Sequence, residues 1–143
     1  MVYPEKEKVL AYIIRRINRQ TELLLFKHRD FPEAGWQVPA GTVEFGEDHQ
    51  AAVLREVKEE SGLTQFSSIR LLDQSTFLHP LKKEVHHRFF YQLEIEGQVP
   101  DEFTHRVSGS GEDEDLIFQY HWIKLTELPS LAAAQGCFLA RVN

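Results

Sequence analysis

Residues 41–63 read GTVEFGEDHQAAVLREVKEESGL, and this stretch decides the fold. Glu59 and Glu60 follow Glu56 by three and four residues, so on a helix of about 3.6 residues per turn all three side chains share one face. Carboxylates gathered on one face repel one another unless a positive charge lies between them. A divalent cation such as magnesium prefers oxygen ligands and would supply that charge. The spacing therefore predicts a helix that carries a metal site.

The ends of the stretch predict where the helix begins and ends. A helix over residues 48–61 places the negative charges of Glu47 and Asp48 near its amino terminus, where they suit the helix dipole. Gly62 follows the last turn, where glycine adopts the left-handed capping conformation at little cost. The residues predicted to contact the core are Ala51, Ala52, Leu54 and Val57.

An isolated Arg-Glu-x-x-Glu-Glu run is typical of a solvated helix face held by weak ion pairs. Here the whole stretch resembles the signature of the Nudix hydrolases, which specifies glycines, acids, one arginine and aliphatic residues at fixed spacing. The specified positions are occupied by Gly41, Glu47, Arg55, Glu56, Val57, Glu59, Glu60, Gly62 and Leu63. The flanking segments WQVPA (36–40) and HWIKL (121–125) also resemble parts of this family.

The rest of the chain predicts an α/β fold in one domain, residues 1–143. Apolar, β-branched and aromatic segments predict strands at 9–15, 22–28, 36–38, 69–77, 86–95 and 116–125. Residues 41–46 are expected to form a loop, and a short helix is expected after Thr126. The resemblance implies a Nudix-type α/β/α sandwich with a mixed β-sheet.

The resemblance also implies that the acids of the signature bind divalent cations, Mg2+ with Mn2+ as the alternative. Glu59 and Glu60 are the expected principal ligands, and Glu56 is either a third ligand or the base that orients water. The remaining predicted ligands are Glu47, directly or through water, and a backbone carbonyl of Ala40 or Gly41. Many family members have a second glycine where this chain has Ala40, so the methyl group is a departure that alters the loop near the metal.

Two further residues are assigned to the catalytic machinery. Arg55 is expected to hold one of the carboxylates through its planar fork rather than touch substrate, the alternative being a plain surface ion pair. The acidic run Glu112–Asp115 occupies a later loop that supplies a base in many family members, and Glu114 is the preferred candidate. The alternative for this glycine-flanked run is a solvated loop.

Composition limits the classes of partner and location. The net charge of −6 makes broad nucleic-acid binding unlikely, because such binding relies on a basic surface. Cys137 is the only cysteine, so an internal disulfide and a multi-thiolate zinc site are excluded. We find no signal-peptide layout and no apolar run of membrane-spanning length. The expectation is a cytoplasmic protein with no membrane partner.

Substrate selection is expected to come from outside the signature. Arg29, Lys82, Lys83 and Arg88 are candidates to meet phosphates, and Phe31, Phe77, Tyr91 and Tyr120 are candidates to stack on a base. For each of them the alternative is a surface charge or a core aromatic residue. His86 and His87 are adjacent in a predicted strand and so point to opposite faces, which argues against a metal-binding pair.

The leading hypothesis is a Mg2+-dependent hydrolase that cleaves a pyrophosphate bond in a nucleoside diphosphate linked to another group. The alternatives are a catalytically silent nucleotide-binding or regulatory protein and an isomerase on the same fold. The segment 36–39 is also similar to a segment of the bacterial enzymes that trim RNA 5′ triphosphates. An RNA 5′-pyrophosphohydrolase is therefore a further alternative. The expected partner is a small-molecule nucleotide substrate. A homodimer is also expected, because homodimers are common in the family.

Overall fold

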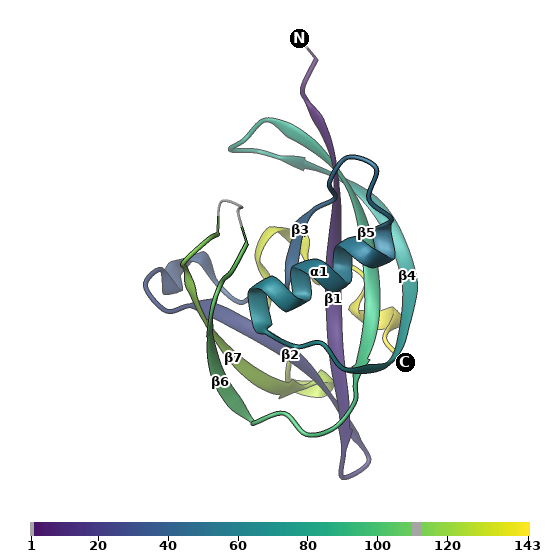
Figure 1. Cartoon of the computed structure of the whole chain (residues 1–143), viewed down its shortest axis with the longest axis vertical. Coiled ribbons are helices and arrows are strands. Elements are labelled where there is room, and N and C mark those ends of the chain that lie inside the picture. The colour runs from purple at the N-terminus through teal and green to yellow at the C-terminus, as the bar shows by residue number, and fades with distance from the viewer. Residues whose placement is uncertain (1, 110–112) are drawn as a thin grey trace.

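A computed structural model describes residues 2–109 and 113–143, so Glu112 of the acidic run lies outside the described residues. The described part forms one seven-stranded sheet in the order β4-β5-β1-β2-β7-β6, with β3 paired to β1 (Figure 1). The strands are β1 (Glu5–Ile17), β2 (Gln20–His28), β3 (Ala40–Thr42), β4 (Phe66–His79), β5 (Glu84–Ile95), β6 (Glu102–Arg106) and β7 (Ile117–Lys124). The α-helix of the described part is α1 (His49–Ser61).

The sheet is mixed because β1 and β5 run parallel while the other pairs are antiparallel. β1 changes its partner along its length: residues 8–10 pair with β3, and residues 14–17 pair with β2. Between these two regions the Ala11 amide donates to the Pro39 carbonyl at 2.9 Å. β2 and β3 therefore occupy the same side of β1 at different points along it, and the Ala11 amide between them is still hydrogen-bonded.

Both faces of the central strands are covered, which explains their long apolar runs. Alternate residues of β1 enter two cores: Val9, Ala11 and Ile13 in one, and Leu10, Tyr12 and Ile14 in the other. α1 crosses the first face and contributes Ala52, Val53 and Val57. The carboxy-terminal segment covers the second face with Leu128, Leu131, Phe138 and Leu139, as the yellow trace behind the sheet shows (Figure 1).

The predicted helix is confirmed to within one residue of its expected start. Asp48 is its N-cap and accepts a hydrogen bond from the Ala51 amide at 3.2 Å, and Gly62 caps its other end with φ 79°. Ala52 and Val57 are buried as predicted. Ala51 and Leu54 are exposed, and Val53 is buried instead, so the apolar face is rotated from the one expected.

The α/β fold with a mixed sheet is confirmed, and three local predictions are wrong. Residues 41–42, the start of the expected 41–46 loop, form β3 together with Ala40, whereas the expected 36–38 strand is reduced to bridges at Trp36 and Gln37. β6 was not predicted, because its five residues alternate only weakly in polarity. The helix expected after Thr126 is replaced by 3-10 turns at Leu125–Glu127, Ala132–Ala134 and Leu139–Arg141. No helix of the described residues is long and apolar enough to cross a membrane.

Candidate active site

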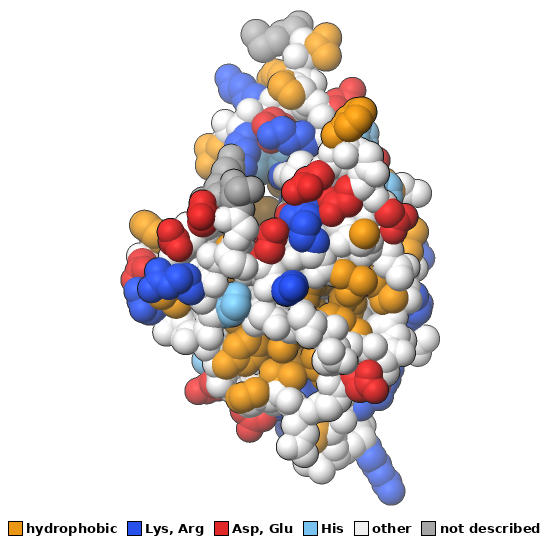
Figure 2. Space-filling view, viewed as in Figure 1, with side chains coloured by type: hydrophobic (Ala, Val, Ile, Leu, Met, Phe, Trp, Pro, Cys, Tyr) orange, Lys and Arg blue, Asp and Glu red, His pale blue; other side chains and the backbone are white. Residues whose placement is uncertain are grey.

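α1 presents its acids to a cavity of about 620 Å³ beside β3. Glu56, Glu59 and Glu60 line the cavity from the helix, and Asp113 and Glu114 line it from the β6–β7 loop. Figure 2 shows a hollow on this face with red acidic side chains on its border and blue Lys and Arg side chains above it. The helical spacing seen in the sequence thus brings three carboxylates to one concave surface, and the fold adds two more.

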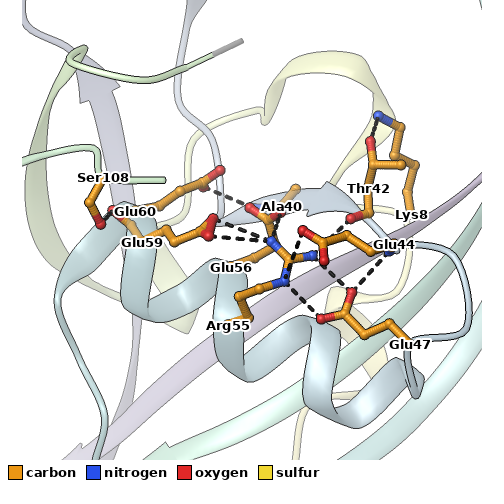
Figure 3. Close-up of polar contacts among 10 residues, drawn as sticks. All are labelled: Lys8, Ala40, Thr42, Glu44, Glu47, Arg55, Glu56, Glu59, Glu60 and Ser108. Carbon is orange, nitrogen blue, oxygen red and sulfur yellow. Dashed lines mark hydrogen bonds and ion pairs between the residues drawn. The ribbon is translucent and has the colours of Figure 1, made fainter. Parts of the chain in front are cut away.

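Arg55 is the centre of the network that holds these acids (Figure 3). Its Nε and Nη2 donate to the two carboxylate oxygens of Glu47 at 2.8 and 2.9 Å, a two-pronged contact that fixes the guanidinium plane. Its Nη1 donates to Glu56 at 2.8 Å and to Glu59 at 3.3 Å. Nη2 also donates to the Thr42 carbonyl at 3.0 Å, which ties helix to β3. Arg55 therefore positions several carboxylates at once.

Glu60 is the most deeply buried acid of the group, with 4% of its surface exposed. Its Oε1 accepts a hydrogen bond from the Ala40 amide at 3.1 Å. The prediction placed a carbonyl of Ala40 or Gly41 at the metal, and the structure brings this segment against the Glu60 and Glu56 carboxylates. Since the amide serves Glu60, the methyl group of Ala40 does not prevent this approach.

Burial, together with neighbouring carboxylates, raises the pKa of two acids of the cavity. Burial raises the pKa of Glu60 well above its usual value, and the charges of Glu56, Asp113 and Glu59 act in the same direction. Burial also raises the pKa of Glu56, against the opposing hydrogen bond from Arg55. Glu47 differs, because its hydrogen bonds from Arg55 lower its pKa to about 2. The cluster is therefore short of positive charge around Glu56 and Glu60.

The last turn of α1 is fastened to the strands beyond the cavity. The Glu59 carbonyl accepts from the Ser108 amide at 3.0 Å, and the Nε2 atom of His105 lies 3.1 Å from it. The Glu60 carbonyl accepts from the buried Tyr120 hydroxyl at 2.8 Å. These contacts satisfy carbonyls that the end of a helix leaves without an intrahelical partner. They also set the β6–β7 loop directly beside the acids.

The donor set at this site fits a hard divalent cation. Several carboxylates reach one cavity, and burial and mutual repulsion disfavour their charged forms, which a bound cation would relieve. In the geometry of the described residues, Arg55 holds two of these carboxylates, and no three His, Cys, Asp or Glu side chains already converge as a ligand group. A bound cation would therefore compete with Arg55 for the carboxylates of Glu56 and Glu59.

Some of the other predicted residues line the cavity, and the rest lie outside it. Lys82, Arg88 and Glu114 line the cavity. Glu47 does not line it, because Glu47 lies on the other side of Arg55. Five predicted residues lie away from the cavity: Arg29, Phe31, Lys83, Tyr91 and Tyr120. Arg29 forms an ion pair with Asp30, Phe31 is half-exposed, and the two tyrosines belong to the core.

Sequence reasoning missed two lysines of the cavity. Lys6 and Lys8 line it, and they precede Leu10 and Tyr12 at alternate positions of β1. The signal was in the sequence: a strand face that is apolar from Leu10 onward carries two cations just before it. Such a change of polarity along one face indicates where a core ends and a cavity begins.

Comparison with known proteins agrees with this architecture. The NUDIX domain model matches residues 6–142. An RNA pyrophosphohydrolase of Caulobacter vibrioides is 32% identical over 114 residues, 73% of this chain and 64% of that protein. One of Roseobacter denitrificans is 49% identical over 47 residues, 33% of this chain and 29% of that protein. This chain thus spans less than two thirds of either relative.

A solved structure matches nearly the whole chain. The crystal structure of a MutT NUDIX hydrolase from Burkholderia pseudomallei has a TM-score of 0.71 and 27% identity, and the match covers 97% of this chain and 98% of that one. The family model, the shared fold and the complete signature agree. The protein is therefore a member of the Nudix hydrolase family.

Proposed function

We propose that this protein is a Mg2+-dependent hydrolase that cleaves a pyrophosphate bond in a nucleoside diphosphate linked to another group. The observation that carries the proposal is the acid cluster of Glu56, Glu59 and Glu60, which α1 presents to the cavity under the control of Arg55. Water attacks one phosphorus atom, the P–O–P bridge breaks, and two phosphate-bearing products leave.

In this proposal the side chains divide the work. Glu59 and Glu60 are the principal cation ligands, with Glu56 and a carbonyl of Ala40 or Gly41 completing the set. Glu47 lies outside the cavity with both carboxylate oxygens on Arg55, so it would assist only through water. Such a cation, when bound, neutralises phosphate charge that would otherwise be repelled by the acids. Mn2+ is the alternative to Mg2+.

Two acids are candidates to take the proton from the attacking water. Glu56 accepts a hydrogen bond from Arg55, which orients its carboxylate. Glu114 lines the same cavity from the β6–β7 loop. Asp113 joins Glu114 at the cavity and is close enough to influence both Glu56 and Glu60. We propose one of these acids as the base and Arg55 as a positioning residue.

A second candidate function is removal of pyrophosphate from RNA 5′ ends. It is favoured by the relatives from Caulobacter and Roseobacter, both named RNA pyrophosphohydrolases. The net charge of −6 opposes long contacts with an RNA backbone, so in this case the protein would hold mainly the 5′ phosphates. The chemistry at the acid cluster would be the same.

A panel assay tests both candidates. Purified protein is incubated with ADP-ribose, other nucleotide sugars, dinucleoside polyphosphates, nucleoside triphosphates and a 5′-triphosphorylated RNA, each with Mg2+, with Mn2+ and with EDTA. We expect cation-dependent turnover of a nucleotide linked to another group. Preferential turnover of the RNA would establish the second candidate, and no turnover of any compound would favour a nucleotide-binding protein without catalysis.

We also propose that the protein has a single domain, a cytoplasmic location and a homodimeric state. Analytical ultracentrifugation would test the homodimer.

A further inference from the structure

The cavity has a basic side as well as an acidic one. Lys6 and Lys8 enter it from β1, Arg88 from β5 and Lys82 from the turn between β4 and β5. β1 and β5 pair in parallel with Lys8 opposite Arg88, so these two cations stand side by side on one face of the sheet. The same face becomes apolar at the next pair, Leu10 and Phe90.

Arg88 is unusual among these cations because it is buried, with 6% of its surface exposed. Its Nη1 donates to the Ala133 carbonyl at 2.7 Å, and its guanidinium lies 3.8 Å above the centre of the Phe77 ring. These contacts fix the guanidinium plane and leave Nε and Nη2 without an acceptor among the described residues.

A buried arginine is normally paired with a carboxylate, since an unpaired buried charge is costly. No Asp or Glu of the described residues forms an ion pair with Arg88. Burial lowers its pKa, and the groups that oppose this effect are Cys137 and Tyr12 rather than a carboxylate. The cavity thus contains a fixed, largely buried fork of N–H donors that has no carboxylate partner among the described residues.

We propose that Arg88 is the centre of an anion subsite that binds a phosphate group of the substrate other than the one beside the α1 acids. The inference rests on the proposed function for the nature of the substrate. The planar guanidinium of arginine can donate two parallel hydrogen bonds to phosphate oxygens. Stacking on Phe77 holds the Arg88 guanidinium in one orientation before a phosphate binds.

The two sides of the cavity are close enough for one substrate to reach both. Lys8 pairs with Arg88 on one flank and with Thr42 on the other, and Thr42 accepts a hydrogen bond from Arg55 through its carbonyl. Neighbouring strands lie about 4.8 Å apart, so roughly 10 Å separates the backbones of Arg88 and Thr42. A chain of phosphates can extend across this width. The acids then face the bond that is cleaved while Arg88 holds a phosphate beyond it.

The test measures binding rather than turnover. Inorganic pyrophosphate is titrated calorimetrically into the protein in EDTA, so that no cation takes part. We expect Arg88→Gln to weaken binding at least ~10-fold, since hydrogen bonds to charged groups are the strong ones. Arg29→Gln is the matched control: Arg29 is exposed, pairs with Asp30 and lies outside the cavity, so its loss should change affinity less than about twofold.

Equal pyrophosphate affinity of Arg88→Gln and the unmodified protein, or no binding by either, would overturn the proposal. Should the variant fail to fold, crystals of the unmodified protein soaked in pyrophosphate decide: density against the Arg88 guanidinium supports the subsite, and its absence there overturns it. Failure of the hydrolase proposal has a different signature. A protein that turns over nothing in the panel but still binds pyrophosphate through Arg88 would keep the subsite and lose the catalytic function.

Discussion

Gly41 lies against the carboxylate of Glu56 so closely that a Cβ atom on Gly41 would stand 2.0 Å from the Glu56 Cδ. The same atom would lie 2.3 Å from both carboxylate oxygens. The first glycine of the signature therefore leaves the space that the Glu56 carboxylate occupies. Its role here is close approach of side chain to backbone, which no other residue type permits.

This relationship predicts that Gly41→Ala displaces Glu56, which Arg55 and the helix hold from the other side. A shift of about 1 Å in a catalytic group can cost ~100-fold in rate, so kcat should fall by that order. Steady-state kinetics on the substrate found in the panel measure it. The control is Gly97→Ala, in open space with φ 86°, which should reduce stability and leave kcat unchanged. Unaltered kcat in Gly41→Ala would contradict the placement of Glu56 in the mechanism.

Glu60→Gln should lower turnover at least ~100-fold while keeping the fold, because loss of a catalytic charge removes transition-state stabilisation. The amide oxygen can still accept the hydrogen bond from the Ala40 amide, so the local geometry is preserved. Kinetics with Mg2+, with circular dichroism of the variant as control, measure the effect. Near-normal rates in a folded Glu60→Gln protein would remove Glu60 from the mechanism.

Glu84 predicts a dependence of stability on pH. Its hydrogen bonds from His86 and Lys6 lower its pKa from 4.5 to about 2. The charged form is thus favoured in the folded state, so the contribution is fully present above pH 4.5 and is lost as the pH falls toward 2. We expect the unmodified protein to have a higher Tm than Glu84→Gln at pH 6, and the difference to shrink through that window. A difference that stays constant from pH 6 to acid would refute the assignment.

Ala134 has φ 55°, a left-handed conformation that costs an L-residue of this kind free energy. Ala134→Gly should relieve this cost and raise the free energy of unfolding by up to about 1 kcal/mol, after allowance for the greater freedom of glycine in the unfolded chain. Chemical denaturation measures the change. The neighbouring Ala132→Gly is the control, since Ala132 is not among the residues with positive φ, and it should destabilise the protein. Destabilisation by both substitutions would show that relief of strain does not dominate at Ala134.

Features encoded by neighbouring residues could be predicted from the sequence. The end of the helix followed from Gly62, because a glycine cap acts within one turn. Its start was placed from the negative charge of Asp48, and the N-cap role of that residue was not predicted. The gathering of Glu56, Glu59 and Glu60 followed from the helical period alone. Arg55 was expected to hold one carboxylate of the signature, and it contacts Glu56 and Glu59. Its two-pronged contact with Glu47 was not specified in advance, since it joins the helix to the loop before it.

Features that depend on distant pairing could not be read in advance. Ser108 reaches Glu59 across 49 residues, and Arg88 reaches Ala133 across 45, so neither contact has a local pattern. β3 was read as loop because Gly41 disfavours a strand by itself. Its pairing with Lys8 and Leu10 of β1 overrides that preference. Selection among Arg29, Lys83 and Arg88 likewise needed the sheet register, which only the three-dimensional structure gives.

The hydrogen bond from the Ser108 amide to the Glu59 carbonyl joins the β6–β7 loop to the last turn of α1. Asp113 and Glu114 follow Ser108 in the same loop, and the side chain of Glu59 belongs to the acid cluster. A displacement of this loop must stretch that bond and so pulls on the backbone of one of the acids. The position of Asp113 and Glu114 relative to the acids of α1 is therefore set in part by one backbone hydrogen bond.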